Sequence, residues 1–365
     1  MTSLTKTIII AEAGVNHNGD LDIALQLVDC AAAAGADYVK FQTFKAEKLA
    51  SSTARKAEYQ KVTTDATESQ LDMLRRLELS ADAHRVLIKR CAERQIAFLS
   101  TAFDIDSLTF LGNVLKLDTL KLGSGELTNG PILLAAARSG MKLMLSTGMG
   151  TLAEVEEALG VLAFGMMTDG TPKARQDFAA ALLKPAAWDA LRARVTLLHC
   201  TTEYPAAVAD TNLRAMDTMG AAFGLPVGYS DHTEGNAMSI AAVARGAVVI
   251  EKHFTLDRGM VGPDHAASVE PADLAALVRD IRAVEAGLGN GIKQPGGAEV
   301  RNRLIARKCV VAARDLPVGH TLSEDDLASK RAGGPISAMA IWDLVGQKTT
   351  EAFAFDQPLH FGGLS

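Results

Sequence analysis

The chain repeats one unit: a short apolar segment that ends in polar residues, followed by a stretch with helical periodicity. Continuous apolar segments, without strict alternation, are expected of parallel strands that are buried on both faces. Helical patterns with a period of 3.6 residues follow them, for example over residues 21–34, 84–94 and 237–245. The eight predicted strands span residues 7–13, 37–43, 97–103, 119–124, 142–147, 195–200, 226–231 and 248–254.

Eight strand–helix units in succession predict an α/β fold of the TIM (β/α)8 barrel type. A doubly wound open sheet is the alternative. It would gather its polar residues at one switch point, whereas here polar residues end all eight predicted strands. Two segments, residues 45–79 and 166–192, interrupt the repeat, and we expect them to be insertions of the kind that form lids or interfaces in barrels.

The pattern changes after a predicted helix that begins at Pro271 and closes the barrel. Residues 287–299 (GLGNGIKQPGGAE) are rich in glycine, which is typical of a linker. From about residue 306 the chain turns to short β-like pieces separated by turns. We therefore expect a catalytic barrel domain over residues 1–286, a linker over 287–305 and a small second domain over 306–365.

The bulk composition excludes several classes of protein. Apolar residues make up 48% of the chain and charged residues 22%, as in ordinary soluble proteins. The net charge of −6 argues against a nucleic acid or an anionic membrane as the main partner. Neither a transmembrane helix nor a signal peptide is expected. The four cysteines are isolated from one another, so we expect a reducing, cytoplasmic location.

Two histidines follow the last two predicted strands, at the end of the barrel where TIM-barrel active sites lie. His232 ends the motif VGYSDH, and His253 ends VVIEKH. Two imidazoles on neighbouring strands predict a metal site, and two protein ligands leave coordination positions open, as a catalytic metal requires. Imidazole and oxygen ligands suit Mn²⁺, with Mg²⁺, Co²⁺ or Zn²⁺ as competitors.

An anion site is predicted at the ends of the second to fifth strands. Lys40 and Lys121 each lie within an apolar strand, in YVKFQ and TLKLG. Hydroxyl groups of Thr101, Ser124 and Ser146 end neighbouring strands, and the glycines of KLGSG and STGMG permit a close approach of the backbone to a phosphate. The alternative for the hydroxyls is that they only cap turns.

These motifs resemble the sialic acid synthase (N-acetylneuraminate synthase) family, and the likeness covers nearly the whole chain. The stretches that carry it include IIAEAGVNHNGD (9–20), YVKFQTFKAEKL (38–49), KLGSGELTN (121–129), LLHCTTEYPA (197–206), VGYSDHT (227–233), VIEKHFTLDR (249–258), GPDHAAS (262–268) and SKRAGG (329–334). The resemblance implies a TIM barrel followed by a small C-terminal antifreeze-like (SAF) domain.

The same resemblance implies a transferase that condenses phosphoenolpyruvate with N-acetylmannosamine and releases phosphate by C–O cleavage. Relatives in the family make legionaminic or pseudaminic acid. A legionaminic acid synthase that acts on 2,4-diacetamido-2,4,6-trideoxymannose is therefore the alternative substrate assignment. Two further alternatives are a Schiff-base aldolase with Lys40 or Lys121 as its nucleophile and a non-catalytic protein that binds sugar phosphates.

The resemblance assigns roles position by position. The implied metal ligands are His232 and His253, with Mn²⁺, or else Mg²⁺ or Co²⁺, as the ion. The implied phosphoenolpyruvate-binding residues are Lys40, Thr101, Lys121, Ser124, Ser146 and Thr202. The implied sugar-binding residues are Gln42, Tyr204, Asp264 and Arg331, and Arg331 would come from the partner subunit of a domain-swapped homodimer. The implied catalytic carboxylates are Glu12, Glu126 and Asp264.

Two positions depart from the family pattern. Ala102 stands where the family commonly has proline in its S-T-P-F-D stretch, and Thr202 stands where some members have asparagine. The first departure leaves Thr101 and Asp104 in place.

Overall fold

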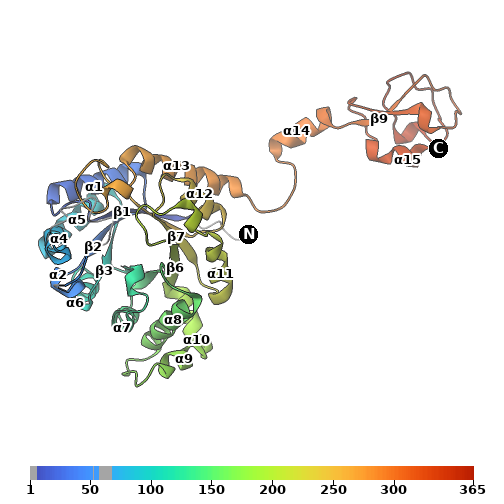
Figure 1. Ribbon diagram of the computed structural model, residues 1–365. Helices are drawn as coiled ribbons and strands as arrows, with labels where there is room; N and C mark the ends of the chain where they lie inside the picture. Colours follow the sequence, from blue (N-terminus) through green and yellow to red (C-terminus); the bar gives the residue numbers. More distant parts are fainter. Residues whose placement is uncertain (1–5, 52, 57–67) are drawn as a thin grey trace. The chain divides into compact units, whose positions relative to one another are not determined.

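A closed barrel of eight parallel strands, taken in the order of the sequence, forms the first part of the chain in this computed structural model (Figure 1). The structure describes residues 6–51, 53–56 and 68–365. The strands are β1 (Ile8–Gly14), β2 (Tyr38–Thr43), β3 (Ala97–Ala102), β4 (Thr119–Leu122), β5 (Lys142–Ser146), β6 (Val195–Cys200), β7 (Val227–Asp231) and β8 (Val249–His253). The predicted TIM barrel is confirmed, and each strand lies close to its predicted bounds.

An outer layer of helices surrounds the barrel. Its members are α1 (Leu21–Ala34), α5 (Ala81–Arg94), α6 (Ile105–Thr109), α7 (Gly130–Arg138), α8 (Leu152–Met167), α11 (Arg214–Phe223), α12 (Ala237–Ala244) and α13 (Pro271–Leu288). Local sequence signals start several of them. Ser80 Oγ accepts a hydrogen bond from the amide of Ala83 at 3.1 Å. Thr151 and Glu154 form the predicted capping box, in which Glu154 Oε2 accepts from the amide of Thr151 at 2.8 Å.

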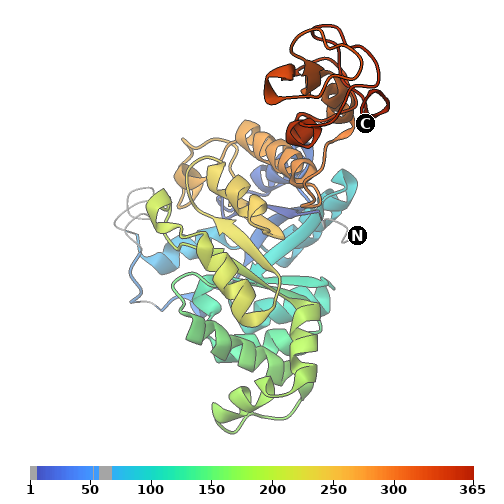
Figure 2. The ribbon, with the colours of Figure 1, turned by 90° about the vertical axis from the view of Figure 1, so that its right-hand side faces the viewer.

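Both predicted insertions contain helices. These are α2 (Ala46–Leu49) and α4 (Gln70–Leu77) in the first insertion, and α9 (Gln176–Leu182) and α10 (Pro185–Arg194) in the second. Residues 52 and 57–67 of the first insertion lie outside the described residues. Figures 1 and 2 both show α9 and α10, drawn in green, beside α8 on the outside of the barrel. A role for either insertion as a lid or an interface stays a prediction.

The interior of the barrel has an apolar layer beneath a polar one. The apolar layer packs Ile10, Leu99, Met144, Leu198 and Val249 against one another. Side chains two residues apart on a strand point to the same face of the sheet. The next inward positions on these five strands are therefore Glu12, Thr101, Ser146, Cys200 and Glu251. The apolar layer closes the barrel from below, so the polar layer faces the carboxyl ends of the strands.

Single turns of helix follow some of the strands and recur in the last part of the chain. They are η1 (Phe110–Val114), η2 (Ser124–Glu126), η3 (Val208–Asp210), η4 (His265–Ala267), η5 (Glu324–Asp326), η6 (Ala338–Ala340) and η7 (Phe361–Gly363). No helix in the described part of the chain combines the length and the apolar character that a membrane span requires.

The chain divides into two compact units, Met1–Gly289 and Asn290–Ser365. In the second unit β9 (Cys309–Ala312) and β10 (Leu327–Lys330) form an antiparallel pair, and α15 (Ile341–Leu344) is a short helix. Their core consists of Val310, Ala312, Leu316, Leu322, Leu327, Ile336, Leu344, Phe353 and Leu359. The segment expected to be a linker contains a helix, α14 (Gly297–Ala306).

A buried carboxylate organises the second unit. Asp326 is fully buried and accepts hydrogen bonds from Arg314 Nε at 2.6 Å, from Ser323 Oγ at 2.7 Å and from the Ser323 amide at 2.8 Å. His320 Nε2 lies 2.9 Å from Asp326 Oδ2, the oxygen that also accepts from Ser323. Burial alone would raise the pKa of Asp326, but the hydrogen bonds from His320, Ser323 and Arg314 outweigh it and lower the pKa.

We therefore expect Asp326→Asn to lower the free energy of unfolding of this unit by about 2–4 kcal/mol at pH 7. A lowered pKa in the folded state adds stability above the unfolded-state pKa of about 4, and this stability is lost as the pH falls below that value. The difference between the variant and the wild type should thus shrink from pH 7 to pH 3 in urea denaturation of the full chain. Asp325→Asn, at an exposed neighbouring position, is the control. A difference that stays constant with pH would contradict this account.

Candidate active site

The polar layer of the barrel contains a cluster of four buried charged side chains. Lys40 Nζ lies 2.7 Å from Glu12 Oε2 and 3.6 Å from Glu251 Oε2. Lys121 Nζ lies 3.5 Å from Glu251 Oε1. All four side chains are no more than 4% exposed. Because a buried charge is costly unless it is paired, these residues stabilise one another inside the barrel.

Hydroxyl groups complete the hydrogen bonds of this charge cluster. Lys40 Nζ donates to Thr101 Oγ1 at 2.8 Å, and Lys121 Nζ donates to Ser146 Oγ at 2.8 Å. Ser230 Oγ donates to Glu251 Oε1 at 2.7 Å. The lysines and hydroxyls that we predicted as an anion site are thus brought together.

Glu251 and Ser230 are site residues that our assignment from the sequence left out. Glu251 lies between the two lysines. The alternation of side chains along a strand could have identified Glu251. Val249, Glu251 and His253 lie at every second position of β8, so a carboxylate two residues before an inward histidine also faces inward. Ser230 lies opposite Glu251 in the register of β7 and β8.

The two carboxylates of the cluster have pKa values shifted in opposite directions. Burial raises the pKa of Glu12 to about 7, although Lys40 acts against it. Burial would also raise the pKa of Glu251, but Lys121 and Lys40 outweigh it and lower the pKa to about 2. Burial lowers the pKa of Lys121. Carboxylates with separated pKa values can take different roles in proton transfer.

A narrow cradle lies beside this cluster, at the loop that follows β5. The amide of Gly148 donates to Ser124 Oγ at 3.0 Å, and Ser124 Oγ lies 3.0 Å from Cys200 Sγ. A Cβ atom on Gly148 would come within 2.3 Å of Thr202 Oγ1 and 2.8 Å of both Ser124 Oγ and Cys200 Sγ. Thr202 Oγ1 is buried and has no hydrogen-bond partner in the described residues. The glycine is therefore required for backbone and hydroxyl groups to converge at this point.

The two predicted metal-binding histidines face each other, with ring centroids 5.5 Å apart. His232 Nδ1 donates to the carbonyl oxygen of Thr201 at 2.7 Å. This bond leaves the lone pair of Nε2 available for a metal, and Nε2 lies 3.4 Å from Ser230 Oγ. His253 Nδ1 is buried without a hydrogen-bond partner in the part of the chain that is described. Burial lowers the pKa of His232 to about 4 and that of His253 well below its usual value. Both rings are therefore neutral at pH 7.

This pair of imidazoles fits a divalent cation. Neutral imidazole nitrogen is a good ligand for first-row metals, and the buried, unpartnered Nδ1 of His253 would gain a partner. No group of three or more His, Cys, Asp or Glu side chains in the described residues has the arrangement of a metal site. An ion here would therefore take two protein ligands and complete its coordination with substrate or water, as expected of a catalytic metal.

The remaining predicted residues of the barrel lie around the histidines. The ring of Tyr204 is 4.2 Å from that of His232 and 5.6 Å from that of His253, measured between centroids. A Cβ atom on Gly14, whose φ is +54°, would lie 3.3 Å from Glu12 Oε1, 3.4 Å from Gln42 Nε2 and 3.5 Å from His253 Cε1. Glu12, Gln42 and His253 thus converge on one glycine of β1.

Two further carboxylates are contributed by loops. Asp264 is buried just before η4, and burial raises its pKa to about 6. Glu126 is buried in η2, where Asn129 Nδ2 donates to its Oε2 at 2.6 Å, and burial raises its pKa.

Arg331 belongs to the second compact unit and is exposed, so its predicted contact with the sugar stays a prediction.

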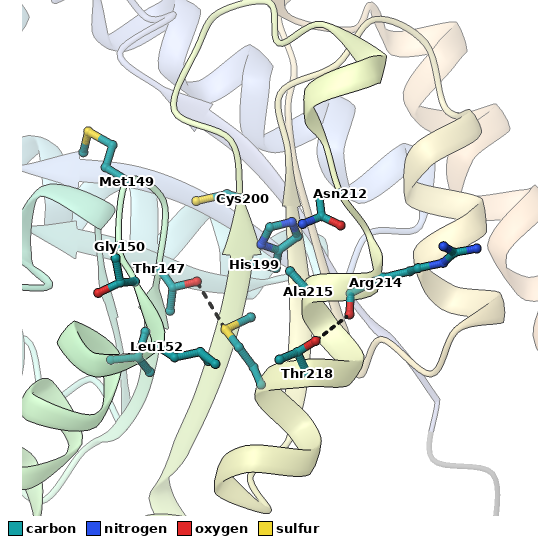
Figure 3. A pocket seen from close by; sticks show the side chains of 13 residues that line it. Thr147, Met149, Gly150, Leu152, His199, Cys200, Asn212, Arg214, Ala215 and Thr218 are labelled. Atoms are coloured by element: carbon teal, nitrogen blue, oxygen red, sulfur yellow. Dashed lines mark hydrogen bonds between the residues drawn. The ribbon is translucent and has the colours of Figure 1, made fainter.

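A cavity of about 350 Å³ lies at the carboxyl ends of β5 and β6, next to this site (Figure 3). It is lined by Thr147, His199 and Cys200 and by the first turns of α8 and α11, so the inward Cys200 is shared with the polar layer. His199 Nε2 is bonded to the carbonyl oxygen of Thr211 at 2.6 Å. The guanidinium group of Arg214 points away from the cavity (Figure 3).

Comparison with known proteins gives a consistent set of relatives. The model of the NeuB family matches residues 27–293, and the SAF domain matches residues 307–364. N,N'-diacetyllegionaminic acid synthase from Campylobacter jejuni is 47% identical over 354 residues, which are 97% of this chain and 99% of that protein. The enzyme of the same name from Legionella pneumophila is 43% identical over 340 residues, 93% of this chain and 89% of that protein.

A solved structure is also similar. It is that of N-acetylneuraminic acid (sialic acid) synthetase from Leptospira borgpetersenii in complex with citrate. Its identity to this chain is 32% and its TM-score is 0.65, with 82% of this chain and 92% of that chain covered.

The cradle at Gly148 generates a testable prediction. Gly148→Ala should weaken the binding of phosphoenolpyruvate by about 100-fold or more, because the added methyl group occupies the space between Ser124 and Thr202. Isothermal titration calorimetry would measure the dissociation constant. Gly130→Ala is the matched control, since a Cβ atom there meets nothing within 4 Å. Unchanged binding in the Gly148 variant would show that the cradle does not contact the ligand.

Proposed function

The chain belongs to the NeuB family, and from this premise we propose that it is a legionaminic acid synthase, which condenses phosphoenolpyruvate with 2,4-diacetamido-2,4,6-trideoxymannose. The resemblance expected from the sequence motifs is confirmed, and so is the SAF domain. The chain is an enzyme, a transferase of the nonulosonic acid synthase class that joins phosphoenolpyruvate to a sugar.

One observation carries the choice of sugar. The chain is 47% identical to a legionaminic acid synthase across almost the full length of both proteins, against 32% for the sialic acid synthetase of known structure. This difference supports the diacetamido sugar over N-acetylmannosamine, which the sequence motifs alone had placed first. N-acetylmannosamine is the second candidate.

In the proposed mechanism, the charge cluster binds phosphoenolpyruvate. Lys40 and Lys121 would neutralise the negative charges of its carboxylate and phosphate groups. The Gly148 amide and the hydroxyls of Ser124, Ser146 and Thr202 would donate hydrogen bonds to its oxygens. This assignment is supported by the environment of the two lysines, because each side chain is buried and paired with a carboxylate that fixes its position. Thr101 orients Lys40 through its hydroxyl group.

His232 and His253 would hold a divalent cation, Mn²⁺ or else Mg²⁺ or Co²⁺, which would supply Lewis-acid polarisation of the sugar aldehyde. Tyr204 and Gln42 would orient the open-chain sugar beside the two rings. A carbon–carbon bond then forms between C3 of phosphoenolpyruvate and C1 of the sugar, and the aldehyde oxygen takes up a proton.

The carboxylates Glu12, Glu126 and Asp264 would stabilise the positive charge that develops at C2 of phosphoenolpyruvate. One of them would accept a proton from the water molecule that adds to C2. The bond between C2 and the phosphate oxygen then breaks, phosphate leaves, and the C2 hydroxyl gives its proton to the phosphate to form the C2 ketone. The raised pKa values of the three carboxyl groups support the role of proton acceptor, since a general base is most effective when its pKa lies near the working pH.

We extend the proposal to a domain-swapped homodimer in which Arg331 of the partner subunit contacts the sugar. Support comes from α14, where Val300, Leu304 and Ile305 are 53%, 75% and 75% exposed and would be covered in a dimer. A cytoplasmic location is also part of the proposal. It is supported by the four free cysteines, Cys30, Cys91, Cys200 and Cys309.

Phosphate release with each sugar in turn tests the choice of substrate. We expect kcat/KM for 2,4-diacetamido-2,4,6-trideoxymannose to exceed that for N-acetylmannosamine by about 100-fold, because a site that binds a second acetamido group loses that interaction with the simpler sugar. The enzyme without either sugar is the blank. An equal or larger kcat/KM for N-acetylmannosamine would identify a sialic acid synthase instead.

Metal removal and His232→Ala test the role of the histidines. Chelation by EDTA should abolish phosphate release, and Mn²⁺ should restore it. The variant should lower kcat by about 100-fold or more even in saturating Mn²⁺, since a lost Lewis-acid site raises the barrier by about 3 kcal/mol. His360→Ala, at a partly exposed position of the second unit, is the control. An unchanged kcat in the His232 variant, with and without metal, would remove the Lewis-acid role.

A further inference from the structure

A buried ion pair lies directly behind the two histidines of the site. Asp231 Oδ2 and Lys252 Nζ are 3.0 Å apart, and the two side chains are 0% and 1% exposed. The two residues stand opposite each other in the register of β7 and β8. Because side chains alternate along a strand, the ion pair lies on the outer face of the barrel, whereas the next residues, His232 and His253, face inward.

The ion pair holds every polar group of the residue that follows His232. Asp231 Oδ1 accepts hydrogen bonds from the amide of Thr233 at 2.9 Å and from Thr233 Oγ1 at 2.8 Å. Lys252 Nζ donates to the carbonyl oxygen of Thr233 at 2.5 Å. Ser239 Oγ, on α12, donates to Asp231 Oδ2 at 2.6 Å. Thr233, which is fully buried, is thus fixed through its N–H, O–H and C=O groups.

These contacts constrain the backbone at both histidines. His232 lies between Asp231 and Thr233, both of which the ion pair fixes, and its carbonyl oxygen accepts the Ala206 amide at 2.9 Å. Lys252 immediately precedes His253, whose carbonyl oxygen accepts the Val269 amide at 2.9 Å. The ion pair therefore includes the residues that precede both histidines, and it is bonded to the residue that follows His232.

The attraction between the two charges is a weak reason for an ion pair at this position. Removing two charges from water is costly, and apolar side chains of similar volume often give a fold that is equally stable or more so. An apolar pair, however, would leave the three polar groups of Thr233 without these partners. Outer contacts that orient metal-binding histidines commonly determine metal affinity.

We propose that the Asp231–Lys252 ion pair is a positioning device that holds His232 and His253 at the separation needed to bind one divalent cation. The inference rests on the proposed function, which gives the two histidines a metal. Asp231 and Lys252 do not touch the substrate or the ion in this proposal. They act only through the backbone around the histidines.

A double variant, Asp231→Leu with Lys252→Met, tests the proposal. It removes both charges together, because either single change would leave one buried charge without its partner. The affinity of the substrate-free protein for Mn²⁺, measured by electron paramagnetic resonance of the free ion, should fall by about 10- to 100-fold. KM for phosphoenolpyruvate should stay close to that of the wild type, because its proposed ligands project mainly from β2 to β5, while kcat falls at subsaturating Mn²⁺.

A second variant covers the case in which the first does not fold. Asp231→Asn with Lys252→Met keeps a side-chain oxygen that can accept from Thr233, so its Mn²⁺ affinity should fall less than that of the first variant. Circular dichroism would establish that each protein is folded. If the first variant is unfolded, a loss of Mn²⁺ affinity in the folded second variant supports the proposal and wild-type affinity overturns it.

The matched control is the ion pair between Asp37 and Arg282 at the opposite end of the barrel. Asp37 Oδ2 accepts from the amide of Ile9 at 2.9 Å and from Arg282 Nη2 at 2.8 Å, so this pair also holds strand backbone. Asp37→Leu with Arg282→Met should leave Mn²⁺ affinity unchanged. An equal loss in the control pair would show a general effect of destabilisation and overturn the positioning role.

Two outcomes separate this proposal from the proposed function. Mn²⁺ binding by the wild type that is lost in His232→Ala but unchanged in the folded double variant overturns the positioning role and leaves the metal site intact. If the wild type binds no Mn²⁺, or if His232→Ala binds it equally well, the metal site itself is wrong and this inference is overturned with it.

Discussion

The pairing of buried charges inside the barrel is the interaction on which the rest of the site depends. Glu12, Lys40, Lys121 and Glu251 project from different strands, and none of them is stable in this environment alone. Their mutual contacts keep two lysines charged and oriented in a region from which water is largely excluded. An anionic ligand that enters the barrel therefore meets cations already in position, which lowers the cost of ordering them.

The strand period produces this arrangement together with the apolar layer beneath it. Ile10 precedes Glu12 by two residues, and Val249 precedes Glu251 by two, so one face of each strand supplies both an apolar and a charged position. The apolar layer closes the barrel on one side of the charges and leaves the carboxyl ends of the strands as the route for substrate. Because side chains alternate, Asp231 and Lys252 point to the outer faces of β7 and β8, where they are buried behind the histidines.

Much of the fold and part of the site could be predicted from the sequence. Strand positions were predictable because parallel strands are continuous apolar runs, and Lys40 and Lys121 stood out within such runs. The face of the sheet to which each side chain points was harder to predict, because His232 and Asp231 are adjacent in the sequence yet lie on opposite faces. Helix α14 was missed because the glycines before it suggested a linker for the whole segment, whereas the helix begins only at Gly297.

The proposed sugar contacts and the proposed phosphoenolpyruvate contacts differ in their position on the barrel. Lys40, Lys121 and His253 belong to strands, whose positions are set by the barrel itself. Of the proposed sugar contacts in the barrel, Gln42 belongs to β2, whereas Tyr204 and Asp264 lie in segments after β6 and β8. Loops can change without disturbing the charge cluster, so one barrel can keep phosphoenolpyruvate as its donor while relatives accept different sugars. For the same reason the motifs at the strand ends are enough to identify the family, whereas the proposed choice of sugar rests on the identity to individual members over the whole chain.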